Sequence, residues 1–253
     1  MSARWREILF YQAWCLLRIE SERLYIGYLW WAVEPLLEMA LLYVVFGAIL
    51  GSPIDHYLSF LLCALVSWRW FAQGVTRAAP SILQNQPLAM QVFVPKLVFP
   101  AAVLLADAAK FAVGLVVLLA FLAADGFRPT AAWIAFPAVL AVQFLLIAAV
   151  ALWTAAVVPL FRSVLVGLDV GLRFGMFSSG VFFDIGRVAE PLRSWLALNP
   201  MAVVIAAWRD VLMHGAWPDA RALAVVALAS LAAIAGARVF VARRELLYPR
   251  LPA

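Results

Sequence analysis

The stretch Gly27–Pro35, GYLWWAVEP, opens an apolar run, LLEMALLYVVFGAIL at 36–50. Because about 20 apolar residues cross the roughly 30 Å of hydrocarbon in a bilayer, this region predicts a membrane span over 28–50. The span contains two acids, Glu34 and Glu38. Charged side chains inside a membrane rarely face lipid, so the stretch predicts a helix with a functional face as well as a lipid-facing one.

Composition places the whole chain in the same class. Of its 253 residues, 67% are apolar and only 13% are charged, and the mean hydropathy is +0.99. A soluble domain is nearer half apolar, so the sequence predicts a polytopic membrane protein. Further spans are predicted at 57–76, 97–123, 131–160, 164–183 and 219–241. The predicted fold is therefore all-α and integral to the membrane, with six transmembrane helices in a single domain, 1–253.

Three segments outside the spans have patterns of their own. Residues 1–24 place charged and apolar residues on opposite stripes, which predicts an amphipathic helix in the membrane interface, either as an anchor or as a contact for a cytoplasmic partner. The 77–96 connection is partly apolar and divided by prolines, which favours a docking element over a linker. Residues 184–215 are broken by Gly186, Pro191 and Asn199-Pro200, and predict a re-entrant pair of short helices.

Basic residues predict the orientation of the spans. Arginines cluster in both tails and in the connections on the same side, so the positive-inside rule places both termini in the cytoplasm. The formal net charge of +5 is in this setting a topology signal rather than a sign of nucleic-acid binding.

Charges at membrane depth predict ion pairs between or along the spans. Asp107 and Lys110 are spaced i,i+3, and Asp169 and Arg173 are spaced i,i+4, so each pair shares a helix face. Counting 1.5 Å per residue from each end places Glu38 and Arg69 at a similar depth, which predicts that Glu38 or Glu34 pairs with Arg69. Two roles stay open for these charges, a buried staple between helices and a polar lining for a charged head group.

Aromatic residues form a second pattern. Tyr28, Trp30 and Trp31 lie at the predicted cytoplasmic boundary, where an ordinary interfacial belt is one explanation. Trp70, Phe174 and Phe177 lie deeper, where rings that face a pore would pack against the C–H faces of sugars.

Signals for chemistry are weak. No phosphate-binding G-x-x-x-x-G-K-[ST] loop occurs, and neither a metalloprotease motif nor a nucleophile elbow is present. Cys15 and Cys63 lack the spacing of metal ligands or of a disulfide framework. The sequence thus gives little support to an enzyme and predicts no catalytic residue, no metal site and no cofactor in this chain.

Five segments in order resemble the permease subunits of ABC-2 type exporters of cell-surface polysaccharides, which carry O-antigen, capsule or teichoic acid. They are G-Y-L-W-x-x-x-x-P at Gly27–Pro35, YLSFLLCALVSWRWF at Tyr57–Phe71, NQPL…VPKLVFP at Asn85–Pro100, SSGVFF at Ser178–Phe183 and LNPMAVVIAAWRDVL at Leu198–Leu212. The resemblance covers nearly the whole chain.

This resemblance implies a homodimer in the bacterial inner membrane, without nucleic acid. Two copies of a separate ATPase, which would hold the ATP and Mg²⁺, would dock on the cytoplasmic side. The substrate would be a glycan linked to polyprenyl pyrophosphate or another lipid, in contact with membrane lipid. Its implied entrance and channel residues are Arg23, Tyr28, Trp30, Trp31, Glu34, Glu38, Arg69, Trp70, Arg173, Phe174 and Phe177.

The same resemblance implies a gate and a coupling surface. Gate residues are Phe182, Phe183, Asn199, Pro200 and Arg209, within 184–215. Residues implied to receive the motion of the ATPase are Arg4, Glu7, Arg18, Asn85, Pro87, Leu88 and Lys96.

The sequence departs from the family at two points. The stretch before Gly27 reads RIESER, in which two glutamates dilute the basic residues that many members have there. The gate reads SSGVFF, which leans towards capsule exporters, whereas WRWF and VPKLVFP are closer to the O-antigen type. O-antigen is the first expectation and capsule the next. The alternatives are an ABC-2 permease for a drug or small lipid, a stand-alone secondary transporter and a membrane glycosyltransferase.

Overall fold

The described part of the chain is helical and contains no strand. The computed structural model describes residues 3–23, 33, 36–37, 40–41, 44, 56–87 and 94–244, with the backbone alone at 3–6 and 21–23. Its helical elements in chain order are α1 (Ala3–Arg23), α3 (Tyr57–Ala78), α4 (Ser81–Gln84), α6 (Val98–Ala124), η3 (Ala131–Ala135), α7 (Phe136–Val157), α8 (Val164–Ser178), η4 (Ile185–Arg187), α9 (Leu192–Ala197), α10 (Pro200–Arg209), the π-helical η5 (Asp210–His214) and α11 (Ala220–Arg244).

Four segments among the described residues are long and apolar enough to cross a membrane. They are Tyr57–Gln84, Val98–Ala124, Ala131–Val157 and Ala220–Arg244. These agree with the second, third, fourth and sixth predicted spans to within a few residues at most ends. The all-helical membrane class is therefore confirmed, while the first predicted span, 28–50, lies almost wholly outside the described residues.

The fifth predicted span, 164–183, is shorter than expected. Its helix α8 has 15 residues and so rises only about 22 Å, against the roughly 30 Å of a hydrocarbon core. The helix ends because Gly180 adopts a left-handed φ of 70°, although apolar residues continue through Phe183. Hydropathy alone does not report this turn. Six spans are thus not established by the described helices.

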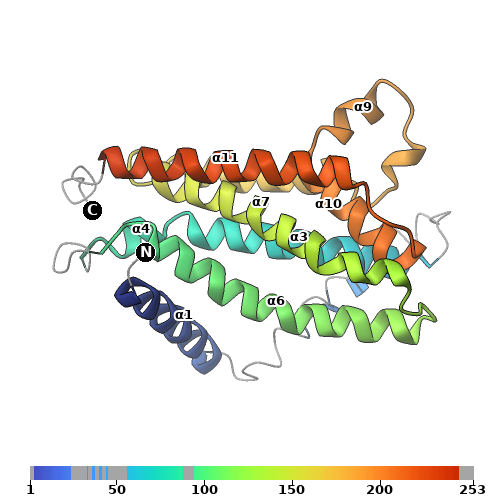
Figure 1. Cartoon of the computed structure of the whole chain (residues 1–253), viewed down its shortest axis with the longest axis horizontal. Coiled ribbons are helices and arrows are strands. Elements are labelled where there is room, and N and C mark those ends of the chain that lie inside the picture. The colour runs from blue at the N-terminus through green and yellow to red at the C-terminus, as the bar shows by residue number, and fades with distance from the viewer. Residues whose placement is uncertain are drawn as a thin grey trace.

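The long helices lie lengthwise beside one another (Figure 1). α7 packs against α11 and α3, and α3 packs in turn against α6. α1 lies obliquely against α6 (Figure 1), with Ala13 packed beside Ala102 and Ala106. The small side chains at this contact let the two helices approach closely.

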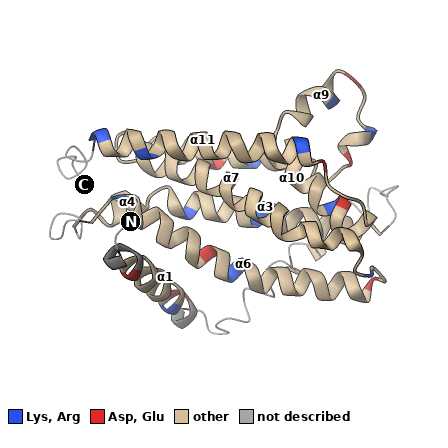
Figure 2. Ribbon diagram, in the orientation of Figure 1, with Lys and Arg blue, Asp and Glu red and all other residues tan. Residues whose placement is uncertain are grey.

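The two ends of this bundle differ. The start of α1, the end of α11 and α4 lie at one end, here called the α4 end, whereas α9 projects at the opposite end, called the α9 end (Figure 1). Charged residues are absent from α7, and the arginines of α11 lie near its two ends (Figure 2). This distribution is typical of helices whose central turns contact hydrocarbon.

A buried polar network ties three helices together. Gln143 of α7 donates to the Ser67 carbonyl of α3 at 2.8 Å and accepts from the indole of Trp208 of α10 at 2.8 Å. The Ser67 hydroxyl also donates to the side-chain amide oxygen of Gln143, Oε1, at 3.3 Å. All three side chains are fully buried. Each polar group therefore has a partner inside the protein, as a site without water requires.

Aromatic rings fill the space next to this network. Trp70 stacks on Phe111, with ring centroids 3.9 Å apart, and on Phe144, with ring centroids 6.1 Å apart. Trp208 contacts the edges of Phe111 and Phe136. These contacts bury large apolar rings, so α3, α6, α7 and α10 form one packed core.

We predict that Gln143→Leu lowers the thermal stability of the purified protein. The change leaves the Trp208 indole N–H buried without an acceptor, at a cost of about 1–3 kcal/mol, which corresponds to a fall in Tm of roughly 5 °C. Thermal unfolding in detergent measures it, with Gln84→Leu at an exposed position of α4 as the control. Equal melting temperatures for the two variants would contradict a stabilising role for the network.

Candidate transport site

Arg209 is the centre of the α9 end. Its side chain is only 6% exposed, yet it finds three carbonyl partners. It donates to the carbonyls of Gly180 at 2.8 Å and Val181 at 3.0 Å, and to that of Phe60 at 3.3 and 3.4 Å. Its guanidinium carbon also lies 3.3 Å from the centroid of the Phe60 ring. One buried cation therefore joins α10, α3 and the turn that follows α8.

The turn after α8 is shaped by Gly180 and Asn199. A Cβ on Gly180 would lie 2.8 Å from Ile185, and its positive φ disfavours any other residue. Asn199 caps α10 by accepting from the Met201 amide at 3.0 Å, while its amide donates to the Ser179 hydroxyl at 2.8 Å. The end of α8 and the start of α10 are thus held together by side chains.

α10 runs from mid-bundle back towards the α9 end. Pro200, at its start, shares a cavity with Leu146 and Val150 in the second half of α7, whereas η5, which follows α10, packs against η3 before the start of α7. Short helices are therefore present in 184–215, while their re-entrant arrangement stays a prediction.

Two phenylalanines of the predicted gate lie beside this turn. Phe182 packs on Phe177 of α8 with centroids 5.2 Å apart, and its carbonyl accepts from the Tyr57 hydroxyl at 3.3 Å. Phe183 is half-buried against the main core. The described gate residues are thus brought into one region, because they all lie on the α8 turn or on α10.

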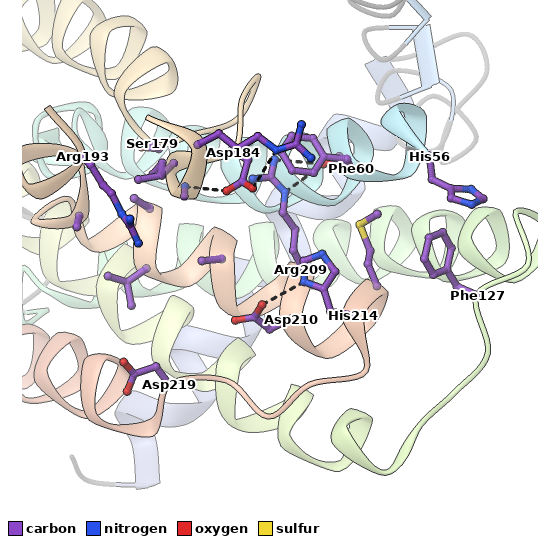
Figure 3. A pocket seen from close by; sticks show the side chains of 18 residues that line it. His56, Phe60, Phe127, Ser179, Asp184, Arg193, Arg209, Asp210, His214 and Asp219 are labelled. Atoms are coloured by element: carbon purple, nitrogen blue, oxygen red, sulfur yellow. Dashed lines mark hydrogen bonds and ion pairs between the residues drawn. The ribbon is translucent and has the colours of Figure 1, made fainter. Parts of the chain in front are cut away.

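A pocket of about 690 Å³, lined in part by charged side chains, opens beside Arg209 (Figure 3). Asp184, Arg187 and Arg193 line it from the segment before and within α9, and the His214–Asp210 pair, 3.2 Å apart, lines it from η5. His56 pairs with Asp125 at 3.0 Å on a further side. Charged side chains from several elements therefore line this cavity at the α9 end.

α8 presents an unusually open face. None of its residues is buried, and Phe174 and Phe177 are 75% and 59% exposed. The predicted pair of Asp169 and Arg173 is confirmed at 2.9 Å on the exposed surface of this helix. Because its large rings and its charged side chains are exposed, α8 has a surface that suits contact with another molecule.

At the α4 end, α1 and the segment before α6 pack together. Ile8 and Leu9 of α1 contact a cluster made of Val94, Val98 and Phe99, while Glu7 and Arg18 point outwards. The exposed side of α1 also carries Phe10 and Trp14, and its position in the membrane interface stays a prediction. α1 therefore packs against a cluster that joins the end of the 77–96 segment to the start of α6.

The other described coupling residues lie close to this contact in the chain. Asn85 donates from its side chain to the Ser81 carbonyl at 2.8 Å and closes the end of α4. Pro87 is exposed, whereas Lys96 is buried, only 6% exposed.

Four charged side chains at the junction of α1, α3 and α6 form the Glu20 network, which consists of Glu20, Arg77, Asp107 and Lys110. The predicted Asp107–Lys110 pair is confirmed at 2.8 Å. Arg77 binds Asp107 at 2.7 Å and Glu20 at 2.7 Å, and Lys110 binds Glu20 at 3.0 Å. Spacing along one helix predicted the first pair, but it carries no information about the partners on α1 and α3.

Several predicted site residues lie in parts of the chain that the structure does not describe. Tyr28, Trp30, Trp31, Glu34, Glu38 and Leu88 lie outside the described residues, as do the side chains of Arg4 and Arg23. The proposed pairing of Arg69 with Glu34 or Glu38 therefore stays a prediction. Trp70 lies in the aromatic core with Phe111, apart from the Phe177–Phe182 contact.

Sequence reasoning missed the Gln143–Trp208 contact and the ring of carbonyls around Arg209. A signal for the first was present, since Gln143 is the one amide in the apolar helix α7. Among the described residues, no group of three or more His, Cys, Asp or Glu could hold a metal ion.

Comparison with known proteins identifies relatives of the chain. Two proteins from Klebsiella pneumoniae, each named O-antigen export system permease protein RfbA, are 24% identical over 200 residues, 79% of this chain and 77% of theirs. A protein of the same name from Myxococcus xanthus is 27% identical over 224 residues, 87% of this chain and 86% of its own. The chain is therefore similar over most of its length to proteins of this name. No family model matches it.

These relatives extend over most of both chains, so the expected resemblance to polysaccharide export permeases is confirmed. It supports a transport subunit of an export system, in agreement with the apolar helices described above.

We predict that Gly180→Ala destabilises the α8–α10 junction. An L residue at φ 70° costs about 1–2 kcal/mol, and the new methyl group clashes with Ile185 at 2.8 Å. Limited proteolysis of the full chain should then cut faster between α8 and α9. Gly114→Ala is the control because a Cβ there meets nothing within 4 Å; equal cleavage rates in both variants would show that the turn is not strained.

Proposed function

We propose that the chain is the channel-forming permease subunit of an ABC transporter that exports a lipid-linked cell-surface polysaccharide, O-antigen in the first place, across the bacterial inner membrane. The observation that carries the proposal is the homology to O-antigen export permeases over 79% and 87% of the chain. The membrane-spanning helices supply the setting that such a subunit needs.

In this proposal, a second copy of the chain completes the channel. The open face of α8 supports it, because Phe174 and Phe177 are exposed in the single chain and aromatic faces bind the C–H surfaces of sugar rings. Trp70 is buried in the subunit core, so its role is to position α3 behind that face.

A separate ATPase, in two copies, would bind ATP and Mg²⁺ and drive the cycle from the cytoplasmic side. The packing of α1 against the cluster of Val94, Val98 and Phe99 supports this, because a displacement of α1 would be transmitted to the start of α6. The start of α1 and the end of α11 lie at that end of the bundle (Figure 1), which supports a common, cytoplasmic side for both.

The segment 184–215 would act as the gate at the far side. Arg209 supports this role because it links the turn after α8 to α3, so that opening requires a change in a small number of strong contacts. The charged side chains of the pocket beside it would form hydrogen bonds with the hydroxyl groups of the passing glycan.

The experiment that tests the function is gene replacement in the source bacterium. Deletion of the gene should abolish the surface polysaccharide and leave lipid-linked glycan inside the cell, and the wild-type gene should restore export. Surface glycan that persists in the deletion strain would refute the proposal. Loss of resistance to a drug with intact glycan would instead favour the small-molecule permease.

We predict that Phe174→Ala combined with Phe177→Ala lowers polymer export about tenfold, since two lost ring contacts of about 0.5–1.5 kcal/mol each sum to that order. Immunoblots of surface glycan measure the loss. Leu228→Ala with Leu231→Ala, which removes exposed apolar groups from α11, is the control. Export that is the same in both double variants would count against a lining role for α8.

We also predict that Trp30→Ala with Trp31→Ala blocks polymer export while the partner ATPase still co-purifies. The reason is that these rings lie at the expected entrance, not in the coupling segments. Normal surface polysaccharide in this double variant would exclude the entrance role.

A further inference from the structure

The Glu20 carboxylate is held in the way that proteins hold a bound anion. Arg77 donates to it with both terminal nitrogens, at 3.2 Å to Oε1 and 2.7 Å to Oε2. Lys110 approaches the same two oxygens at 3.1 and 3.0 Å. A planar guanidinium fork combined with an ammonium group recognises phosphates as well as carboxylates.

The two cations are fixed independently of Glu20. Asp107, which is only 3% exposed, binds both of them through a single oxygen, Oδ1, at 2.7 Å to Arg77 and 2.8 Å to Lys110. Its other oxygen, Oδ2, is buried and has no hydrogen-bond partner. Asp107 therefore orients the cations. Of the four side chains in the network, two cations and one carboxylate remain if Glu20 leaves.

Glu20 is the member of the network that is able to leave. Arg77, Asp107 and Lys110 lie on α3 and α6, which pack along each other within the core. Glu20 lies on α1, which contacts α6 mainly through small and partly buried apolar residues, and Glu20 is about one-third exposed. A stronger anion can therefore displace it without disturbing α3 or α6.

The position of the network selects the ligand. Arg77 lies in the last turn of α3, next to α4, so the site is at the α4 end of a membrane-spanning helix (Figure 1). Lys110 lies at mid-length of α6, and the Arg77 side of the site, 31% exposed, is the side from which a lipid phosphate group would enter.

We infer that Arg77 and Lys110 form a binding site for the phosphate or diphosphate head group of a lipid, closed in this structure by the carboxylate of Glu20, which the ligand replaces. Displacement of Glu20 frees the C-terminal end of α1, the helix that contacts the coupling segment. Ligand binding at the site is thereby linked to α1. The inference deepens the proposed function and depends on it for the identity of a diphosphate ligand.

The test measures binding of farnesyl pyrophosphate to the full chain in phosphatidylcholine nanodiscs. Glu20→Gln removes the competing charge and should bind the probe about tenfold more tightly than the wild type, the scale of one charged hydrogen bond. The double variant Glu20→Gln with Arg77→Gln should lose this gain. Glu190→Gln, which removes an exposed carboxylate near α9, is the charge-matched control and should bind like the wild type.

The double variant separates an anion site from a merely structural staple. If Glu20→Gln tightened binding only by loosening α1, the double variant would bind as tightly as the single one, and this result would overturn the inference. Unchanged affinity in Glu20→Gln would overturn it as well. Arg77→Lys, which keeps the charge and the fold but lacks the fork, should bind more weakly than the wild type.

Two further probes identify the source of the head group. Competition by inorganic pyrophosphate but not by phosphatidylglycerol assigns the site to the diphosphate of a lipid-linked glycan. Equal competition by phosphatidylglycerol assigns it to an ordinary membrane phospholipid. Surface glycan in cells reports separately on the proposed function: Glu20-dependent binding together with normal glycan in a deletion strain would refute export and leave the anion site intact.

Discussion

A polar group inside a membrane-spanning bundle has to find its partner in the protein, because hydrocarbon offers none. This constraint explains the contacts that organise the described helices. Gln143 satisfies Trp208 and Ser67 in the centre of the core, and Arg209 satisfies three carbonyls at the α9 end. Asp107 holds two cations near the α4 end. In each case the polar group joins different helices, so the requirement for a partner also fixes how those helices pack.

The sequence was sufficient to predict the features that depend on residues close together in the chain. The ends of α3, α6 and α11 were predicted to within a few residues because the apolar runs end where charges or prolines begin. The Asp107–Lys110 and Asp169–Arg173 pairs followed from helical spacing. What the sequence could not supply were partners from other helices. The position of Glu20 between Arg77 and Lys110 depends on how α1 docks, which no spacing rule describes.

Some features of the candidate site were likewise predicted from the sequence, and others were not. Gate residues from Phe182 to Arg209 were predicted as a group from a resemblance, and the structure brings the described ones together around the turn after α8. The turn itself was not predicted, since Gly180 is followed by apolar residues that look like a continuing span. Trp70 was expected to face substrate but is stacked against Phe111, because a ring in an apolar helix has the same pattern whether its neighbour is a pore or another ring.

The Glu20 network has a consequence for how the protein is made. Glu20 precedes Arg77 by 57 residues and Lys110 by 90 residues, so the ribosome delivers the carboxylate long before either cation. During synthesis Glu20 gains Arg77 only once α3 has been made, and Lys110 only once α6 has followed. Docking of the first helix is therefore one of the later steps of assembly, and an undocked α1 marks a chain whose membrane insertion is incomplete.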